Sequence, residues 1–91
     1  MIVAAIRHPV NDWDVWKAAF DSYPPTDHGA LFARVNRLVD DPNVVVVVSG
    51  FETLEVAKAF LDSPGLKEKM IEAGVAGEPR IEIYEEVAVL Q

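Results

Sequence analysis

Residues 40–48 read DDPNVVVVV, a polar turn followed at once by five consecutive valines. Proline suits an inner position of such a turn, and Asp and Asn favour turns as well. The stretch before the turn, residues 30–39, is mostly apolar and has the composition of a strand. Two strands joined by a four-residue turn form an antiparallel hairpin, and the rest of the predicted fold is built around this hairpin.

Strands and helices are predicted on both sides of the hairpin. Residues 2–8 are a short apolar run rich in β-formers, and residues 80–89 alternate apolar with polar side chains, so both are predicted strands. Apolar side chains at helical spacing predict helices near residues 12–23 and 53–73. The order β-α-β-β-α-β predicts an α+β, ferredoxin-like fold, in which helices cover one face of a four-stranded antiparallel sheet. Because 91 residues are too few for two separate cores, we expect residues 1–91 to form a single domain.

The ends of the helices carry recognisable capping residues. Asn11 and Asp12 can each cap the first helix, and with Asn11 as the cap, Val10 and Val15 occupy the two positions of a hydrophobic staple. Ser63, followed by a proline, restarts a helical turn, so the last part of the second helix is predicted to be a broken extension.

Composition excludes several classes of function. The chain has 15 acidic and 8 basic residues, a formal net charge of -7, so we expect no nucleic-acid partner and no membrane-surface partner. No cysteine is present, which excludes disulfides, thiolate catalysis and zinc–sulfur sites and fits a cytoplasmic location. No apolar stretch reaches the ~20 residues that span a bilayer, and the first residues lack the pattern of a signal peptide.

The second face of the predicted sheet needs a cover. Five valines in a row place β-branched side chains on both faces of one strand, and residues 2–6 are equally apolar, whereas the helices cover one face only. The simplest cover is a second copy of the same sheet, so we expect a homodimer formed through the sheet face. The last strand ends in an apolar tail, and we expect Val89 and Leu90 to reach the partner, which would protect an aggregation-prone edge.

Several stretches, in order along the chain, resemble the small bacterial proteins of the dimeric α/β-barrel superfamily, which includes the antibiotic-biosynthesis monooxygenase-like domains. They are residues 6–10 (IRHPV), Trp13, residues 16–21 (WKAAFD), residues 40–45 (DDPNVV), residues 57–61 (AKAFL), Ser63, Pro64, Leu66, Met70 and residues 73–75 (AGV). The resemblance covers nearly the whole chain and implies the ferredoxin-like fold and dimerisation.

The resemblance also implies a range of activities. Members of that superfamily include cofactor-independent monooxygenases, polyketide cyclases, haem-degrading enzymes and lactone isomerases. Similar small proteins often carry an arginine between the first helix and the second strand. Residues 24–29 of this chain read PPTDHG, without arginine, so a site in that loop is not expected to carry over.

One histidine and an aromatic stripe are the candidate site residues. His8, at the end of the first strand, is the candidate catalytic residue, because a neutral imidazole can move a proton near pH 7. Trp13, Trp16 and Tyr23 lie on one face of the first helix and, with Arg34, are the candidate ligand-binding residues of a pocket between helix and sheet. The alternatives are that the aromatic residues belong to the core and that Arg34 pairs across the dimer. No metal site is expected, because the two histidines lack the spacing of a metal-binding pair.

Three functions remain open at this point. The first is a cofactor-independent monooxygenase or cyclase-like enzyme that acts on a small aromatic or polyketide-like molecule and has no bound cofactor. The second is a non-catalytic small-molecule-binding or structural dimer, whose ligand would be small and apolar or aromatic. The third is a haem-handling protein, although neither histidine lies in a recognisable haem-ligand motif.

Overall fold

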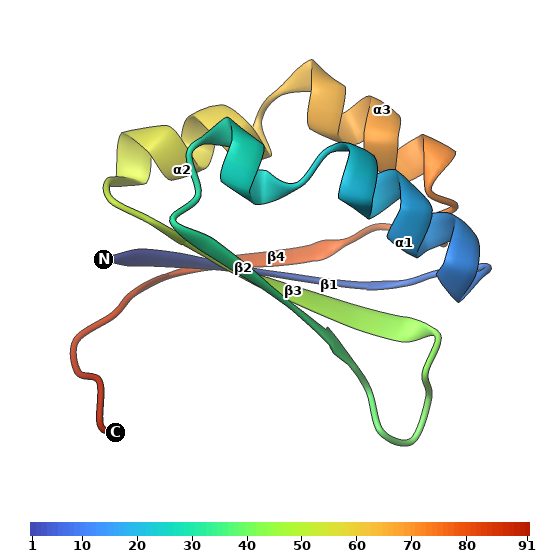
Figure 1. The fold of residues 1–91 in the computed structure, drawn as a ribbon, viewed down its shortest axis with the longest axis horizontal. Helices are drawn as coiled ribbons and strands as arrows, with labels where there is room; N and C mark the ends of the chain where they lie inside the picture. Colours follow the sequence, from blue (N-terminus) through green and yellow to red (C-terminus); the bar gives the residue numbers. More distant parts are fainter.

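The computed structural model describes residues 1–91 as an antiparallel four-stranded sheet with all helices on one face (Figure 1). The strands lie in the order β2-β3-β1-β4. In chain order the elements are β1 (Ile2–Pro9), α1 (Trp13–Ser22), the short three-ten helix η1 (Pro25–His28), β2 (Phe32–Arg37), β3 (Val44–Phe51), α2 (Leu54–Leu61), α3 (Pro64–Glu72) and β4 (Arg80–Glu85). This arrangement confirms the predicted ferredoxin-like fold. No helix is long and apolar enough to cross a membrane.

The valine run forms most of β3, a central strand of the sheet. Val45 and Val47 face the helices and are 0% and 5% exposed. Val46 and Val48 alternate with them and therefore point to the opposite face, which no helix of this chain covers (Figure 1). The two faces of the sheet are called here the helix-covered face and the open face.

Helix α1 begins at Trp13, after the second of the two caps that the sequence offers. Asp12, not Asn11, is the N-cap, and its Oδ1 accepts hydrogen bonds from the backbone N–H groups of Asp14 and Val15 at 2.9 and 3.2 Å. The backbone N–H of Asn11 instead donates to the carbonyl oxygen of Gly74 at 3.0 Å. Asn11 is thus held outside the helix by a tertiary contact, and the predicted hydrophobic staple is not in the required register.

Serine caps the restart that divides the second helical region into α2 and α3, as predicted. Ser63 Oγ accepts a hydrogen bond from the backbone N–H of Leu66 at 3.2 Å, and Pro64 occupies the first helical position. Helix α2 has an equivalent cap, because Thr53 Oγ1 accepts from the backbone N–H of Val56 at 3.2 Å.

Two of the predicted strands are shorter in the structure. Strand β2 begins at Phe32 rather than at Ala30, because the Ala30 N–H closes the three-ten turn by donating to the Pro25 carbonyl. Strand β4 ends at Glu85, opposite Ile2, rather than at residue 89; one more hydrogen bond, from the Glu86 N–H to the Met1 carbonyl at 2.9 Å, brings the pairing to the first residue of the chain. The tail that follows is exposed and extends away from the helices, on the open-face side (Figure 1).

The core under the helices consists of two clusters. The first cluster gathers buried side chains of β1, β3, α2 and the start of α3, including Phe51 and Phe60. The second cluster gathers Trp16 of α1 with Val45, Val47 and residues at the far end of α3. Both clusters rest on the helix-covered face, and the space between them holds the candidate site.

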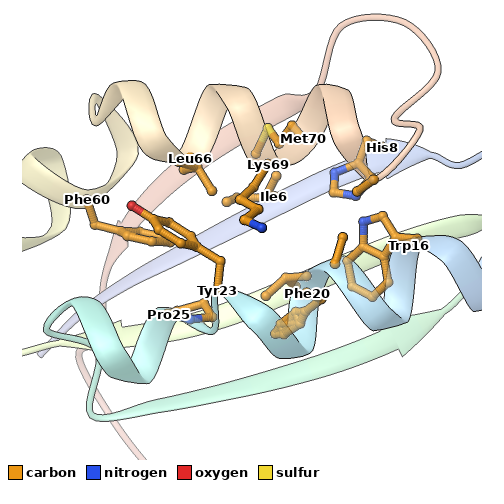
Figure 2. Close-up of a pocket in the computed structure, with 13 residues that line it drawn as sticks. Ile6, His8, Trp16, Phe20, Tyr23, Pro25, Phe60, Leu66, Lys69 and Met70 are labelled. Atoms are coloured by element: carbon orange, nitrogen blue, oxygen red, sulfur yellow. The ribbon is translucent and has the colours of Figure 1, made fainter.

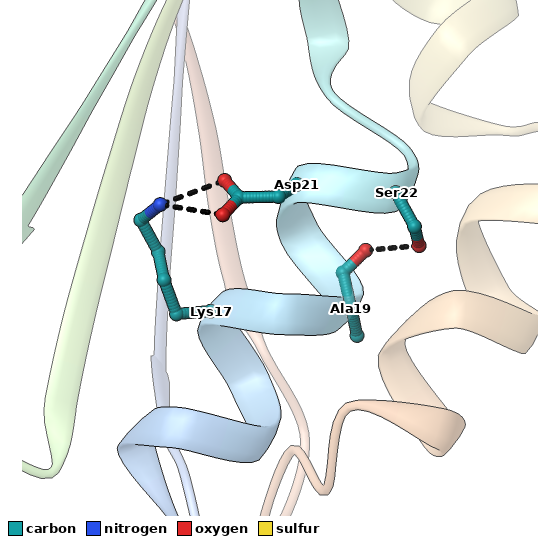
Figure 3. A network of polar contacts seen from close by, with 4 residues as sticks. All are labelled: Lys17, Ala19, Asp21 and Ser22. Atoms are coloured by element: carbon teal, nitrogen blue, oxygen red, sulfur yellow. Dashed lines mark hydrogen bonds and ion pairs between the residues drawn. The ribbon is translucent and has the colours of Figure 1, made fainter.

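The outer face of α1 is polar and exposed (Figure 3). Lys17 Nζ contacts both carboxylate oxygens of Asp21 at 2.7 and 2.8 Å, and Ser22 Oγ donates to the Ala19 carbonyl at 2.7 Å. A solvent-exposed pair at this helical spacing stabilises a helix by about 0.3–0.5 kcal/mol. The stability of α1 therefore comes mainly from its buried aromatic side.

Candidate functional site

A cavity of about 60 Å³ lies between the sheet and the helices α1 and α3, at the boundary between the two core clusters (Figure 2). Ten of its thirteen lining residues are hydrophobic. The lining residues are Ile6, His8, Trp16, Ala19, Phe20, Tyr23, Pro25, Val47, Phe60, Leu66, Lys69, Met70 and Ala73. An apolar enclosure with a few polar groups is the usual form of a small-molecule site.

His8 is the buried titratable group of this cavity. It lies on β1 opposite Val45 and is only 3% exposed. Neither Nδ1 nor Nε2 has a hydrogen-bond partner. Burial lowers the pKa of His8 below its usual 6.5, because the apolar surroundings disfavour the charged imidazolium. The ring is therefore neutral at pH 7 and retains a free lone pair that can accept a proton.

Aromatic rings of α1 form one wall of the cavity. The Trp16 ring lies 5.8 Å from the His8 ring between centroids, and Phe20 stacks on Trp16 at 5.1 Å. At the other end of the cavity, Tyr23 stacks on His28 at 3.9 Å. His28 itself lies in η1 and does not line the cavity. These rings offer flat apolar surfaces of the kind that hold a planar ligand.

Lys69 of α3 is the charged side chain of the cavity, and it was not among the site residues predicted from the sequence. Its side chain is 30% exposed, its Nζ lies 3.3 Å from Glu72 Oε2, and Figure 2 shows it reaching toward the space between α1 and α3. A signal was present in the sequence, because Lys69 follows Leu66 by three positions and precedes Ala73 by four. Both neighbours are buried, so Lys69 shares their face.

The structure brings together three of the five predicted site residues. His8, Trp16 and Tyr23 all line the cavity. Trp13 does not line it: its ring stacks on Trp16 and lies 4.2 Å from the Arg37 guanidinium, toward the β2 side of the sheet. Phe20 packs against the second core cluster and also lines the cavity.

Arg34 does not line the cavity either, which corrects the expectation that it points into a pocket between helix and sheet. It pairs with Val48 in the β2–β3 ladder and so projects from the open face, with its guanidinium 4.6 Å from the Phe32 ring. The register of the ladders places Asn36 and Tyr84 on the open face as well. The position of Arg34 agrees with the alternative, in which it lies at a face between two copies of the chain.

The cavity is small compared with a ring-shaped ligand. Its volume of about 60 Å³ has room for a few water molecules, whereas a cavity that binds benzene measures about 150 Å³. Met70 and Lys69 are its most flexible lining side chains, and rotation of either enlarges the space. No three His, Asp or Glu side chains converge in an arrangement that could hold a metal ion. The site therefore offers a neutral base, one cation and aromatic walls.

Comparisons with known proteins identify the fold. No family model matches the chain, and no curated protein has a recognisably similar sequence. Among solved structures, the cofactor-independent oxygenase SnoaB from Streptomyces nogalater is similar with a TM-score of 0.80 and 13% identity, over 98% of this chain and 95% of that one. Two proteins provisionally described as antibiotic biosynthesis monooxygenases are also similar. The one from Caulobacter crescentus has a TM-score of 0.77 and 17% identity, over 96% of this chain and 90% of that one.

The other protein provisionally described as an antibiotic biosynthesis monooxygenase, from Deinococcus radiodurans, has a TM-score of 0.76 and 13% identity, over 100% of this chain and 97% of that one. Sequence identities this low establish a shared fold and nothing about shared site residues. The chain thus has the fold of the antibiotic biosynthesis monooxygenases, which confirms at the level of structure the resemblance noted in the sequence.

Proposed function

We propose that this protein is a cofactor-independent monooxygenase that acts on a small hydroxylated aromatic or polyketide-like molecule. The observation that supports it most is His8, a buried, neutral imidazole whose two nitrogens lack partners beside an apolar cavity. A buried polar group without a hydrogen bond destabilises the fold, so its presence calls for a functional reason. The structural similarity to SnoaB, a cofactor-independent oxygenase, supports the same reaction class.

The proposed chemistry begins with proton transfer. His8 removes a proton from an acidic C–H or O–H group of the substrate, and the anion that forms is stabilised by the ammonium group of Lys69. The anion supplies the electrons that reduce dioxygen. A hydroperoxide forms at the substrate carbon and then loses water, so one oxygen atom enters the product ketone and the other leaves as water. In a cyclase-like reaction, the same anion would attack a carbonyl group within the substrate.

Oxygen uptake tests this proposal. With 1,8-dihydroxyanthrone as the substrate, we expect the protein to consume dioxygen faster than the uncatalysed oxidation and to form the anthraquinone. His8→Gln should lower kcat about 10²- to 10⁴-fold, the contribution typical of a general base. His28→Gln is the matched control for loss of an imidazole: His28 lies outside the cavity and touches it only through the Tyr23 ring, so the loss of rate should be far smaller than in His8→Gln.

A non-catalytic binding protein is the alternative, and the same samples distinguish it. Such a protein would show a raised Tm with the anthrone, because a ligand of the native state stabilises it, but no oxygen uptake above background. An unchanged rate in a folded His8→Gln variant would contradict the assignment of His8 as the base. The circular dichroism spectrum of each variant shows whether it is folded.

We also propose that the protein is a homodimer formed through the open face. Val46 and Val48 of β3, with Val3 and Ala5 of β1, make this face apolar, and the helices of the chain all lie on the other side (Figure 1). Burial of this face against a second copy removes apolar area from water, and obligate interfaces of this kind commonly exceed about 2,000 Å². Light scattering of the native protein should give twice the 10.0 kDa mass of the chain. A mass near 10.0 kDa at micromolar concentration would exclude the dimer.

The cytoplasm of a bacterial cell is the location that we propose for this chain. The absence of cysteine and the acidic composition support this location. Fractionation of cells that express the chain with an epitope tag tests it, and recovery in a membrane or external fraction would contradict it.

A further inference from the structure

A second hollow, a groove of about 410 Å³, runs along the outer side of α3 next to the edge strand β4. Its apolar wall is formed by Met70, Ile71, Val75 and Ile81. Ile71 is 81% exposed and Ile81 is 41% exposed, so large apolar side chains are in contact with water along this groove. Contiguous exposed apolar surface of this kind commonly marks a binding site.

Met70 belongs to both hollows. Its side chain lines the inner cavity beside Lys69 and also lines the outer groove beside Ile71. An unbranched thioether has three rotatable bonds and repacks at low cost, so Met70 can move without disturbing the helix. At this point the flexible side chain of Met70, on helix α3, therefore separates the cavity from the groove.

The sheet surface beneath Met70 also connects the cavity with the groove. Ile6 lines the inner cavity, Ile81 lines the outer groove, and the two are direct partners in the β1–β4 ladder. Side chains of directly paired strand residues lie about 5 Å apart on the same face of a sheet. The cavity and the groove are thus neighbouring parts of one apolar surface, divided above by Met70.

We propose that the cavity and the groove are two subsites of one ligand site, and that the ligand is an elongated molecule with a planar hydroxyaromatic head and an apolar chain. The head lies in the cavity beside His8, and the chain passes Met70 and lies along Ile71 and Ile81 in the groove. The inference rests on the proposed function for the position of the head. It adds the shape of the substrate and the role of Met70 as the partition between subsites.

Size and charge both support this ligand. The cavity of about 60 Å³ is smaller than the ~150 Å³ of a cavity that binds benzene, so the head enters it as Met70 and Lys69 rotate outward, and the groove of about 410 Å³ takes the chain. The groove carries one lysine and one glutamate at its margin, Lys67 and Glu78, whose charges balance. An uncharged apolar chain is therefore the part of a ligand that it suits.

A pair of probes tests the two subsites by binding alone, under argon, so that no turnover occurs. Fluorescence titration with 2-naphthol reports the head, and titration with 6-hexyloxy-2-naphthol reports head and chain together. We expect the wild-type protein to bind the hexyl ether about tenfold more tightly than 2-naphthol, because the chain is removed from water in the groove. Ile71→Glu should remove that preference and leave the affinity for 2-naphthol within about twofold of wild type.

Matched variants make the result specific. Val15→Glu places the same change at an exposed helical position outside both hollows and should preserve the tenfold preference. Met70→Ala should increase the association rate of 2-naphthol about fivefold, since the partition is shortened. Equal affinities of the two probes for wild type, failure to bind either probe, or an unchanged preference in Ile71→Glu would each overturn the inference.

Two further outcomes separate this inference from its premises. If the hexyl ether binds only after residues 87–91 are deleted, the tail of a second copy fills the groove, and the inference is overturned. If both probes bind with the expected preference but 1,8-dihydroxyanthrone causes no oxygen uptake, the proposed function fails and the two-part ligand site stands.

Discussion

His8 occupies a position where an apolar side chain would be expected. Its neighbours are Val45 across the ladder and Trp16 above it, and both of its nitrogens are buried without partners. Such a group costs about 1–3 kcal/mol relative to a satisfied one, a large share of the stability of a small domain. Replacement by an apolar side chain of similar shape removes that cost. The fold retains this destabilising residue beside a cavity, a combination that is characteristic of functional sites.

The first prediction concerns the pH dependence of stability. Well above pH 6.5 the His8 imidazole is neutral in both the folded and the unfolded chain. As the pH falls below 6.5, the unfolded chain takes up a proton, whereas the folded protein does not until the pH reaches its lowered pKa. The free energy of unfolding should therefore decrease across this window in wild type by more than it does in His8→Phe.

Urea denaturation from pH 8 to pH 5 measures this effect, and the difference between the two proteins isolates the contribution of His8, because every other titratable group is present in both. His8→Phe should be at least as stable as wild type at pH 8 and progressively more stable below pH 6.5. Parallel curves for wild type and His8→Phe would show that the folded protein takes up the His8 proton as readily as the unfolded chain does.

The predicted site residues show what a periodic pattern can establish. The spacing of the aromatic residues placed them on one face of α1, and Trp16 and Tyr23 do line the cavity. Spacing alone did not determine which ring lies over the cavity, and Trp13 lies outside it because it packs against Arg37. Arg34 was misplaced because the face of an edge strand depends on register, which is set by pairing with Val48.

At the scale of the elements, the order of strands and helices was predictable because turn residues, capping residues and apolar alternation mark the individual elements. The polar turn before Val44, the caps Thr53 and Ser63, and the alternation in β4 are all local signals. The helix and strand ends that the sequence did not determine depend on tertiary contacts. Asn11 and Asp12 are both suitable caps, and the choice between them depends on the bond from Asn11 to Gly74, which sequence does not reveal.

The second prediction tests that assignment of the cap. Asp12→Ala removes the acceptor for two backbone N–H groups at the start of α1 and should lower the free energy of unfolding by about 1 kcal/mol. Asn11→Ala keeps the backbone bond to Gly74 and should cost clearly less. Chemical denaturation of both variants at pH 7 measures the difference. A larger loss for Asn11→Ala would place the cap at residue 11.

At the scale of the whole molecule, the distribution of charge favours an interface at the open face. Three of the four arginines, Arg7, Arg34 and Arg80, project from the open face, around its apolar centre of β1 and β3 side chains. Arg80 pairs with Glu82 at 3.2 Å within the chain. The exposed tail that begins at Glu86 is drawn on the open-face side of the sheet (Figure 1). In a dimer with two-fold symmetry, acidic groups of one copy can meet the arginines of the other, and the tail can cover apolar surface that its own chain leaves exposed.

The third prediction uses the two faces of β3 to separate folding from assembly. Val45 and Val47 are buried under the helices, so Val45→Asp with Val47→Asp places two unpaired carboxylates in the core. The cost exceeds the stability of a domain of this size, and the variant should be unfolded by circular dichroism. Val46 and Val48 face away from the helices, so Val46→Asp with Val48→Asp leaves the core intact and makes the open face polar.

That second variant should retain its secondary structure and scatter light as a 10.0 kDa monomer with reduced solubility, since the rest of the open face stays apolar. The comparison is well matched, because both pairs lie on the same strand, carry the same substitution and alternate residue by residue. If the Val46→Asp and Val48→Asp variant kept the size of the wild-type assembly, the open face would not be the interface. If both variants unfolded, the sheet would need its partner in order to fold, and the monomer would have no independent stability.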